Sequence, residues 1–116
     1  MLDEAVLQRH VGGRNAMASQ LRKLLSVADL GNVEIRVIPF RNGERLGLWG
    51  SLMILEFAAP EDEEIAFVEY QMGDSIIDGG AHLVAPYLKK FWSLETISAS
   101  VEESVALVED SLRKLS

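Results

Sequence analysis

The clearest pattern of hydrophobic and polar positions lies between Ser51 and Gln71. Two apolar runs, SLMILEF and IAFVEYQ, flank the acidic segment AAPEDEE, which contains Pro60. Each run has the length of a β-strand, and a polar segment with a proline between two such runs is typical of a turn. The pattern therefore predicts a β-hairpin. Because side chains alternate along a strand, Glu69 should share a face with Ile65 and Phe67.

Apolar residues at helical or alternating spacing predict the other elements. Helices are expected over Asn15–Ala28, His82–Leu94 and Ser100–Leu115, and strands over Asn32–Phe40 and, as a short segment, Ser75–Ile77. The run Leu2–Leu7 fits either a strand or the first turn of a helix.

Three positions predict helix ends. Asn15 is a suitable N-cap, and Ser100 with Glu103 forms a capping box. Pro86 lacks a backbone N–H, so the regular part of its helix should begin close to it.

Together these elements predict an α+β fold, with an antiparallel sheet of three to five strands flanked by three helices, in a single domain over residues 1–116. The last helix has a narrow apolar stripe, which is typical of a seam between two helices. This stripe packs either within the domain or against a second subunit. Because small domains often gain stability by dimerising, we expect a homodimer.

The composition of the chain limits the cellular compartments and the binding partners that we expect for the protein. The chain has no cysteine, which excludes disulfides and thiolate chemistry. Its first residues, MLDEAVLQRH, predict no signal peptide, and no apolar run reaches the ~18 residues that a membrane span needs. The formal net charge of -7 either serves solubility alone or favours a cationic partner such as a lysine-bearing peptide. We therefore expect a cytoplasmic protein that binds neither nucleic acid nor membrane.

The segment Arg41–Gly50 contains three glycines together with Leu46, Leu48 and Trp49. Large apolar residues in a glycine-rich loop are expected either to fold back on the core or to cap a pocket or a partner surface.

Candidate chemistry depends on three carboxylates at apolar strand positions, Glu4, Glu56 and Glu69. A carboxylate that faces an apolar sheet surface loses hydration, which favours its protonated form and suits a base near neutral pH. Alternatively, each lies at a sheet rim or pairs with an arginine such as Arg36. Nucleotide-binding, nucleophile-elbow and zinc-protease motifs are absent, and we expect neither a metal nor a cofactor.

Several segments, in this order, resemble a known module. They are LDEAVL at residues 2–7, VGG at 11–13, Gln20-Leu21 with Leu24-Leu25, Asn32-Val33, Val37-Ile38-Pro39, Phe67-Val68-Glu69 and Ser100–Ser104. Together they are similar to the C-terminal domain of unknown function in actinobacterial XRE-type regulators, where it follows a helix-turn-helix. The resemblance covers nearly the whole chain.

The chain departs from that pattern in ways that suggest reuse of the module. It opens with its own Met1, without the DNA-binding helices and the first part of the module. It also differs at five positions, namely Trp49, Leu52, Glu56, Pro86 and Val101. Lone proteins of this size occur in the biosynthetic clusters of cinnamycin- and duramycin-type lantibiotics, and the chain resembles the lysinoalanine-forming synthases found there.

In that family, a peptide lysine amine adds to a dehydroalanine and closes a macrocycle. The resemblance implies a cofactor-free enzyme that binds a modified lanthipeptide and acts mainly by positioning, since effective molarities can reach ~10⁵–10⁸ M. The base would be Glu69, Glu4 or a carboxylate of the peptide itself. The peptide-binding residues implied are Trp49, Phe40, Tyr70, His10 and Arg14.

Two alternatives remain open from the sequence. One is a non-enzymatic regulatory module that binds a small ligand or a partner protein, like the C-terminal part of the regulators that the chain resembles. The other is an interaction protein that dimerises through its last helix.

Overall fold

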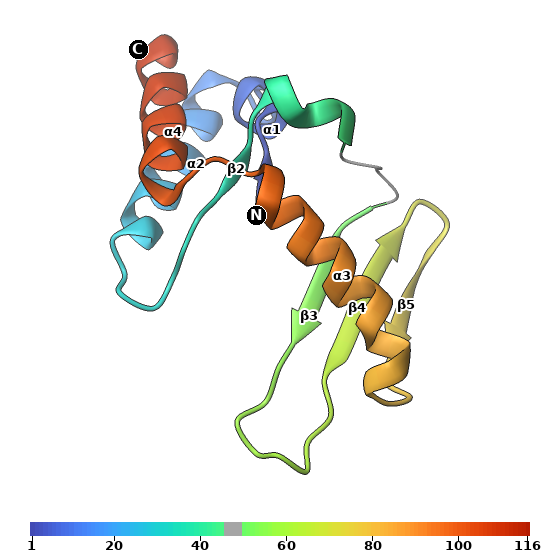
Figure 1. The fold of residues 1–116 in the computed structure, drawn as a ribbon. Coiled ribbons are helices and arrows are strands. Elements are labelled where there is room, and N and C mark those ends of the chain that lie inside the picture. Colours follow the sequence, from blue (N-terminus) through green and yellow to red (C-terminus); the bar gives the residue numbers. More distant parts are fainter. Residues whose placement is uncertain (46–49) are drawn as a thin grey trace. The chain divides into compact units, whose positions relative to one another are not determined.

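The computed structural model describes residues 1–45 and 50–116 (Figure 1). Contacts between residues divide the chain into two compact units. The helical unit comprises Met1–Leu46 and Glu95–Ser116, and the sheet unit comprises Gly47–Leu94. The single domain expected from the sequence, which would contain both units, stays a prediction.

The helical unit combines two very short strands with helices. Its elements are β1 (Leu2–Asp3), α1 (Ala5–Gln8), α2 (Arg14–Ala28), β2 (Val37–Ile38), a 3₁₀ helix (Phe40–Arg45) and α4 (Val101–Leu115). β1 and β2 pair in parallel, with Leu2 opposite Val37. The run Leu2–Leu7 therefore holds both of the structures that its sequence allowed, a strand followed by the start of a helix.

α2 and α4 pack against each other and supply most of the core of the helical unit. The buried cluster consists of Leu7, Met17, Leu21, Val37 and Val108. Met17 and Leu21 are four residues apart, so they lie on one face of α2. Leu112 and Leu115 of α4 pack against the same cluster. The apolar stripe of the last helix is thus used inside this unit, and the expected homodimer stays a prediction.

A buried hydrogen bond joins α4 to β2. Ser104 is fully buried, and its Oγ accepts a hydrogen bond from the N–H of Val37 at 2.8 Å. The carbonyl oxygen of Val37 accepts a second one from the N–H of Ala99, also at 2.8 Å. The N–H and the carbonyl oxygen of Val37 point away from β1, because alternate residues of a strand direct these groups to opposite sides. The bonds to Ser104 and Ala99 therefore satisfy both groups.

The sheet unit is a three-stranded antiparallel meander followed by a helix. Its elements are β3 (Leu52–Leu55), β4 (Ile65–Tyr70), β5 (Gly73–Ile77) and most of α3 (Ala81–Ile97), and the sheet order is β3-β4-β5. The hairpin predicted over Ser51–Gln71 and the short strand predicted at Ser75–Ile77 are confirmed. The α+β fold class is likewise confirmed.

One face of this sheet is covered by α3. Ala66 and Val68 alternate on β4, point to the same face and are fully buried. Val84, in the first turn of α3, is fully buried as well, and Figure 1 shows α3 crossing the sheet. A hydrogen bond between Tyr70 and Tyr87 ties the end of β4 to the helix. The face that carries Ala66 and Val68 is therefore the inner face of the unit.

Two predictions in the helical unit are wrong in their bounds. α2 begins at Arg14 with Gly13 rather than Asn15 as its N-cap, because Gly13 takes up a φ of +88° that turns the chain into the helix. The strand predicted over Asn32–Phe40 shrinks to Val37–Ile38. Its partner β1 is only two residues long, so the remaining residues have no ladder to join.

The start predicted for α3 at His82 is within one residue of the observed start, but the prediction that the regular part of the helix begins close to Pro86 is wrong. The helix begins at Ala81, five residues before Pro86. A proline in the second turn removes one N–H donor, and the burial of Val84 in the sheet unit holds the first turn in place despite this loss. Leu83, in the same turn as Val84, is 46% exposed.

The cap predicted for α4 is confirmed, since Ser100 Oγ accepts a hydrogen bond from the N–H of Glu103 at 3.1 Å. The first part of the glycine-rich segment forms the 3₁₀ helix. Leu46, Leu48 and Trp49 lie outside the described residues, so the expectation that this loop caps a pocket or returns to the core stays a prediction.

Replacing Ser104 by alanine tests the bond between α4 and β2. Ser104→Ala leaves the buried N–H of Val37 without an acceptor, so we expect a loss of about 1–3 kcal/mol in the free energy of unfolding. Chemical denaturation followed by circular dichroism measures this loss. The matched control is Ser26→Ala, because Ser26 is exposed on α2 and its hydroxyl bonds only the nearby carbonyl oxygen of Lys23. Equal stabilities of the two variants would contradict the role given to Ser104.

Candidate functional site

The face of the three-stranded sheet opposite α3 carries apolar side chains. Directly opposed residues on neighbouring strands point to the same side, so Met53, Phe67 and Ile76 form one row across the sheet. Leu55 and Ile65 form the next row. Met53, Leu55 and Ile76 are 55%, 42% and 66% exposed. We call these five residues the open sheet face, and a contiguous exposed apolar surface of this kind marks an interaction site.

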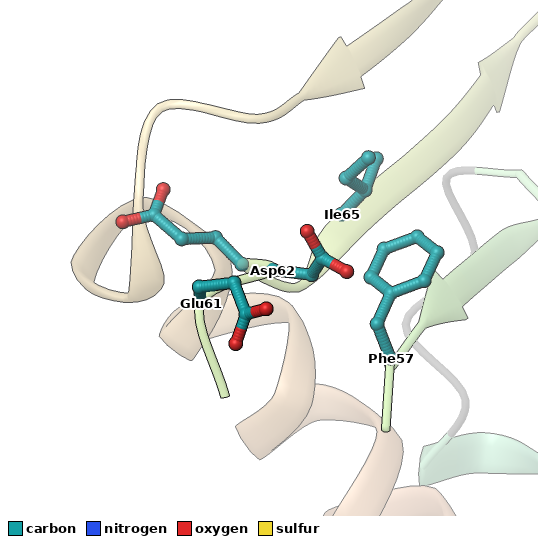
Figure 2. A pocket seen from close by; sticks show the side chains of 5 residues that line it. Phe57, Glu61, Asp62 and Ile65 are labelled. Carbon is teal, nitrogen blue, oxygen red and sulfur yellow. The ribbon is translucent and has the colours of Figure 1, made fainter. Parts of the chain in front are cut away.

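One end of the open sheet face leads into a hollow of about 510 Å³ with acidic walls (Figure 2). Its lining residues are Phe57, Glu61, Asp62, Glu63 and Ile65. Figure 2 shows the Phe57 ring and the Ile65 side chain near each other, with the carboxylate of Asp62 projecting beside them. An apolar wall rimmed by carboxylates suits the aliphatic stem and the ammonium group of a lysine. We call this feature the acidic hollow.

The other end of the open sheet face also carries two carboxylates. Glu69 on β4 lies opposite Asp74 on β5, on the same side as Phe67 and Ile76. Like charges directly opposite each other repel, and a cation bound between them relieves that repulsion. Gly50 lies against the main chain of Glu69, where a Cβ atom would overlap the Glu69 carbonyl oxygen. The open sheet face therefore has an apolar centre and negative charge at both ends.

Glu69 falls on the face that the sequence predicted, but this face is not the core side of the sheet. The residue is exposed, so its carboxylate lies in water and not against a buried apolar surface. Glu56 follows the end of β3 and is exposed too.

Tyr70 lies on the inner face, next to Tyr87 of α3. Burial raises the pKa of Tyr87, and the neighbouring phenol of Tyr70 raises it further through charge repulsion and a hydrogen bond. Because Tyr70 and Glu69 are consecutive on β4, they point to opposite faces of the sheet. They therefore cannot line one surface, although the sequence placed both in one peptide site.

The helical unit contains a second hollow, the apolar pocket, with a volume of about 410 Å³. It is lined by Leu2, Val6, Leu7, Arg9, Val11, Ala16, Met17, Gln20, Leu21 and Leu24. Its floor consists of buried core residues, and at its lining Val6 and Val11 are 46% and 77% exposed. Gly12 and Gly13, with φ values of +80° and +88°, make the tight turn that brings α1 and α2 together around it.

The structure brings Glu4 and Phe40 together. Glu4 Oε2 accepts a hydrogen bond from the N–H of Phe40 at 2.6 Å, and the N–H of Glu4 donates to the carbonyl oxygen of Ile38 at 3.0 Å. This carboxylate therefore ties the start of α1 to the 3₁₀ helix. The Phe40 side chain itself is 57% exposed.

The predicted site residues are divided between the two units. Glu4, His10, Arg14 and Phe40 belong to the helical unit, Glu69 and Tyr70 belong to the sheet unit, and Trp49 lies outside the described residues. His10 is exposed between two residues that line the apolar pocket. Arg14 is exposed and donates a hydrogen bond to the carbonyl oxygen of Leu115 at 2.8 Å.

Sequence reasoning missed both the open sheet face and the apolar pocket. A signal for the first was present, because the run Leu52–Leu55 is apolar on both strand faces rather than alternating with polar residues. The pocket had no comparable signal, since its residues come from three consecutive segments whose packing the spacing does not reveal.

The described residues 1–45 and 50–116 contain no group of three or more histidine or acidic side chains that could hold a metal ion. No helix in the same part of the chain is both long and apolar enough to cross a bilayer.

The Tyr70–Tyr87 pair is testable by ultraviolet titration of phenolate. The raised pKa means that folding keeps the Tyr87 phenol neutral, so this contribution to stability is present below the ordinary tyrosine pKa and is lost as the pH rises through the raised value. In Tyr70→Phe, we expect the pKa of Tyr87 to fall toward its ordinary value without reaching it, because burial, the largest cause, remains in part.

The variant Tyr87→Phe identifies which transition of the unmodified chain belongs to Tyr87, since the chain has only two tyrosines. An unchanged Tyr87 transition in Tyr70→Phe would show that the two phenols do not interact.

Comparison with known proteins identifies the module. Residues 1–110 match a family model described as a domain of unknown function, DUF5753. No curated protein and no solved structure matches the chain. The match includes residues of both the helical unit and the sheet unit, and it agrees with the resemblance to a C-terminal domain of unknown function. The chain belongs to the DUF5753 family.

Proposed function

We propose that this chain binds a modified lanthipeptide and promotes formation of its lysinoalanine cross-link, mainly by positioning the reacting groups. The observation that carries the proposal is the open sheet face, which is apolar at its centre and negatively charged at both ends. An apolar peptide that contains lysine matches this surface in polarity and in charge. The reaction itself is proposed from the resemblance to the lysinoalanine-forming synthases.

The proposed reaction is an addition that needs no cofactor. The lysine nitrogen forms a bond to the β-carbon of dehydroalanine, the carbon–carbon double bond becomes single, and the α-carbon takes up a proton while the nitrogen loses one. No atom is gained or lost overall. Holding the two ends of one peptide together can therefore supply much of the acceleration, because it replaces a search through many chain conformations.

The carboxylates around the open sheet face serve recognition in this proposal. A neighbouring negative charge favours the charged form of a lysine, whereas the attacking nitrogen must be neutral. A lysine seated in the acidic hollow is consequently held but not activated. The proton must leave elsewhere, to Glu69 or Glu4 or to a carboxylate of the peptide itself. Of the two protein groups, Glu69 lies at the end of the open sheet face, and Glu4 already accepts a hydrogen bond from Phe40.

The second candidate is a non-enzymatic regulatory module that binds a small ligand or a partner protein. Membership of the DUF5753 family favours it, since the same kind of domain is what the chain resembles in XRE-type regulators. An interaction protein that dimerises through α4 has less support, because the apolar stripe of α4 packs on the core shared with α2.

Incubation with a dehydrated lanthipeptide precursor tests the proposed function. Closing the bridge leaves the mass unchanged, so the product is detected by chromatographic retention and by fragmentation in mass spectrometry. Ile76→Lys places a positive charge on the open sheet face, and we expect cyclisation to slow at least about tenfold, which corresponds to about 1.4 kcal/mol of lost binding. The matched control is Leu30→Lys, since Leu30 is 52% exposed and belongs to the helical unit.

Two further results decide between the candidates. Peptide binding without cyclisation across several precursors would refute the enzyme and favour the regulatory module. Full activity of both Glu4→Gln and Glu69→Gln would exclude a base on the protein and leave positioning with a peptide carboxylate as base.

A further inference from the structure

The apolar pocket of the helical unit has the dimensions of a small-molecule site. Its volume of about 410 Å³ falls within the range of ~300–1,000 Å³ that such sites span. Leu7, Met17 and Leu21 at its floor are at most 7% exposed, so the pocket reaches the core of the unit. Val6 and Val11 are 46% and 77% exposed, and a bound apolar molecule would remove their side chains from water.

The lining of the pocket carries a single charged side chain, that of Arg9. Within the part of the chain that the structure describes, the Arg9 guanidinium forms neither an ion pair nor a side-chain hydrogen bond. Gln20 is the one uncharged polar residue of the lining. Arg9 is exposed, so its guanidinium can pair with a negatively charged group on a ligand that occupies the pocket.

The charge of the surrounding segment points the same way. Residues 5–28 include four cationic side chains and no carboxylate, although the whole chain has a formal net charge of -7. The four are Arg9, Arg14, Arg22 and Lys23. Apart from Leu2, the lining of the pocket therefore lies in a long stretch of the chain that attracts anions, in contrast to the open sheet face, which attracts cations.

We propose that the apolar pocket binds a small molecule with an apolar chain and one carboxylate, of the kind of a medium-chain fatty acid. The apolar chain contacts Val6, Val11 and the buried floor, and the carboxylate pairs with Arg9. One guanidinium balances the single charge of a carboxylate, whereas a phosphate monoester carries up to two charges and would need further cations in the lining. This ligand site is distinct from the proposed peptide site in residues, in charge and in ligand.

Binding of three ten-carbon probes to the full chain tests this proposal. Decanoate, 1-decanol and decylamine share the apolar chain and differ only in the charge of the head group. Titrations followed by nuclear magnetic resonance locate each probe through the amide signals of residues 6–24. We expect saturable binding of decanoate, roughly tenfold weaker binding of decanol, since a charged hydrogen bond contributes about this factor, and the weakest binding for decylamine.

Three variants separate the pocket from a general charge effect. Arg9→Gln should reduce decanoate affinity roughly to that of decanol and leave decanol affinity unchanged. Arg22→Gln removes the same charge from α2 outside the pocket lining and should change decanoate affinity less than about twofold. Val6→Ser, at an exposed lining position, should weaken both decanoate and decanol.

Several outcomes would overturn the proposal. They are an absence of saturable decanoate binding, equal effects of Arg9→Gln and Arg22→Gln, and binding of vesicles that contain phosphatidylglycerol without binding of free decanoate, which would identify a membrane surface. A second copy of the chain seated on the pocket would make decanoate affinity fall as protein concentration rises. None of these readouts involves cross-link formation, so this proposal and the proposed function can each fail alone.

Discussion

The described part of the sheet unit has three strands and one helix, and the single helix covers only one face of the sheet. α3 covers the face that carries Ala66 and Val68, and these two residues together with Val84 are fully buried. Among the described residues 50–94 of this unit, no second element covers the opposite face, and the side chains of Met53, Leu55 and Ile76 stay in contact with water. Apolar area of this kind has a favourable free energy of burial that folding of the unit does not use. It remains available for a ligand or a partner.

Charge then decides which ligand this surface selects. The acidic hollow bounds the open sheet face at one end, and the Glu69–Asp74 pair bounds it at the other. Two copies placed face to face would bring carboxylates against carboxylates in either direction, which disfavours a dimer through this face. An apolar peptide with positive charges instead gains from both the centre and the ends. In the proposed function, the acidic hollow favours the charged form of a lysine whereas the attacking nitrogen must be neutral, so binding in the hollow and attack on dehydroalanine are separate steps.

The helical unit also combines an apolar surface with charge, but the charge beside its pocket is positive. Its core is closed by α2 and α4 and by the buried bond between Ser104 and Val37, which fixes β2 against α4. α1 is only four residues long and the turn after it contains two glycines, so α1 and α2 leave a pocket that reaches the core. Residues 5–24 around that pocket hold only cationic side chains, and the carboxylates of Asp3 and Glu4, next to Leu2 of the lining, accept hydrogen bonds from the backbone. An acidic chain thus contains one region suited to anionic ligands and one suited to cationic ligands.

The sequence by itself determined the local structure. Apolar spacing predicted the hairpin, the meander, α2 and α4, because period and turn chemistry are properties of short segments, and Ser100 with Glu103 predicted the cap of α4. Tertiary contacts decided the exact bounds of two elements, which the spacing of apolar residues does not determine. Burial of Val84 keeps the turn before Pro86 regular, and the short partner β1 limited β2 to two residues.

The same division applies to the candidate sites. Alternation correctly grouped Glu69 with Ile65 and Phe67, yet it could not show which side of the sheet α3 would cover. It also could not show that Tyr70 would face the helix, that Glu4 would bond the backbone of Phe40, or that residues 2–24 would enclose a pocket. Sequence pattern distinguishes the two faces of an element, whereas the element that packs against each face is set by contacts between residues distant along the chain.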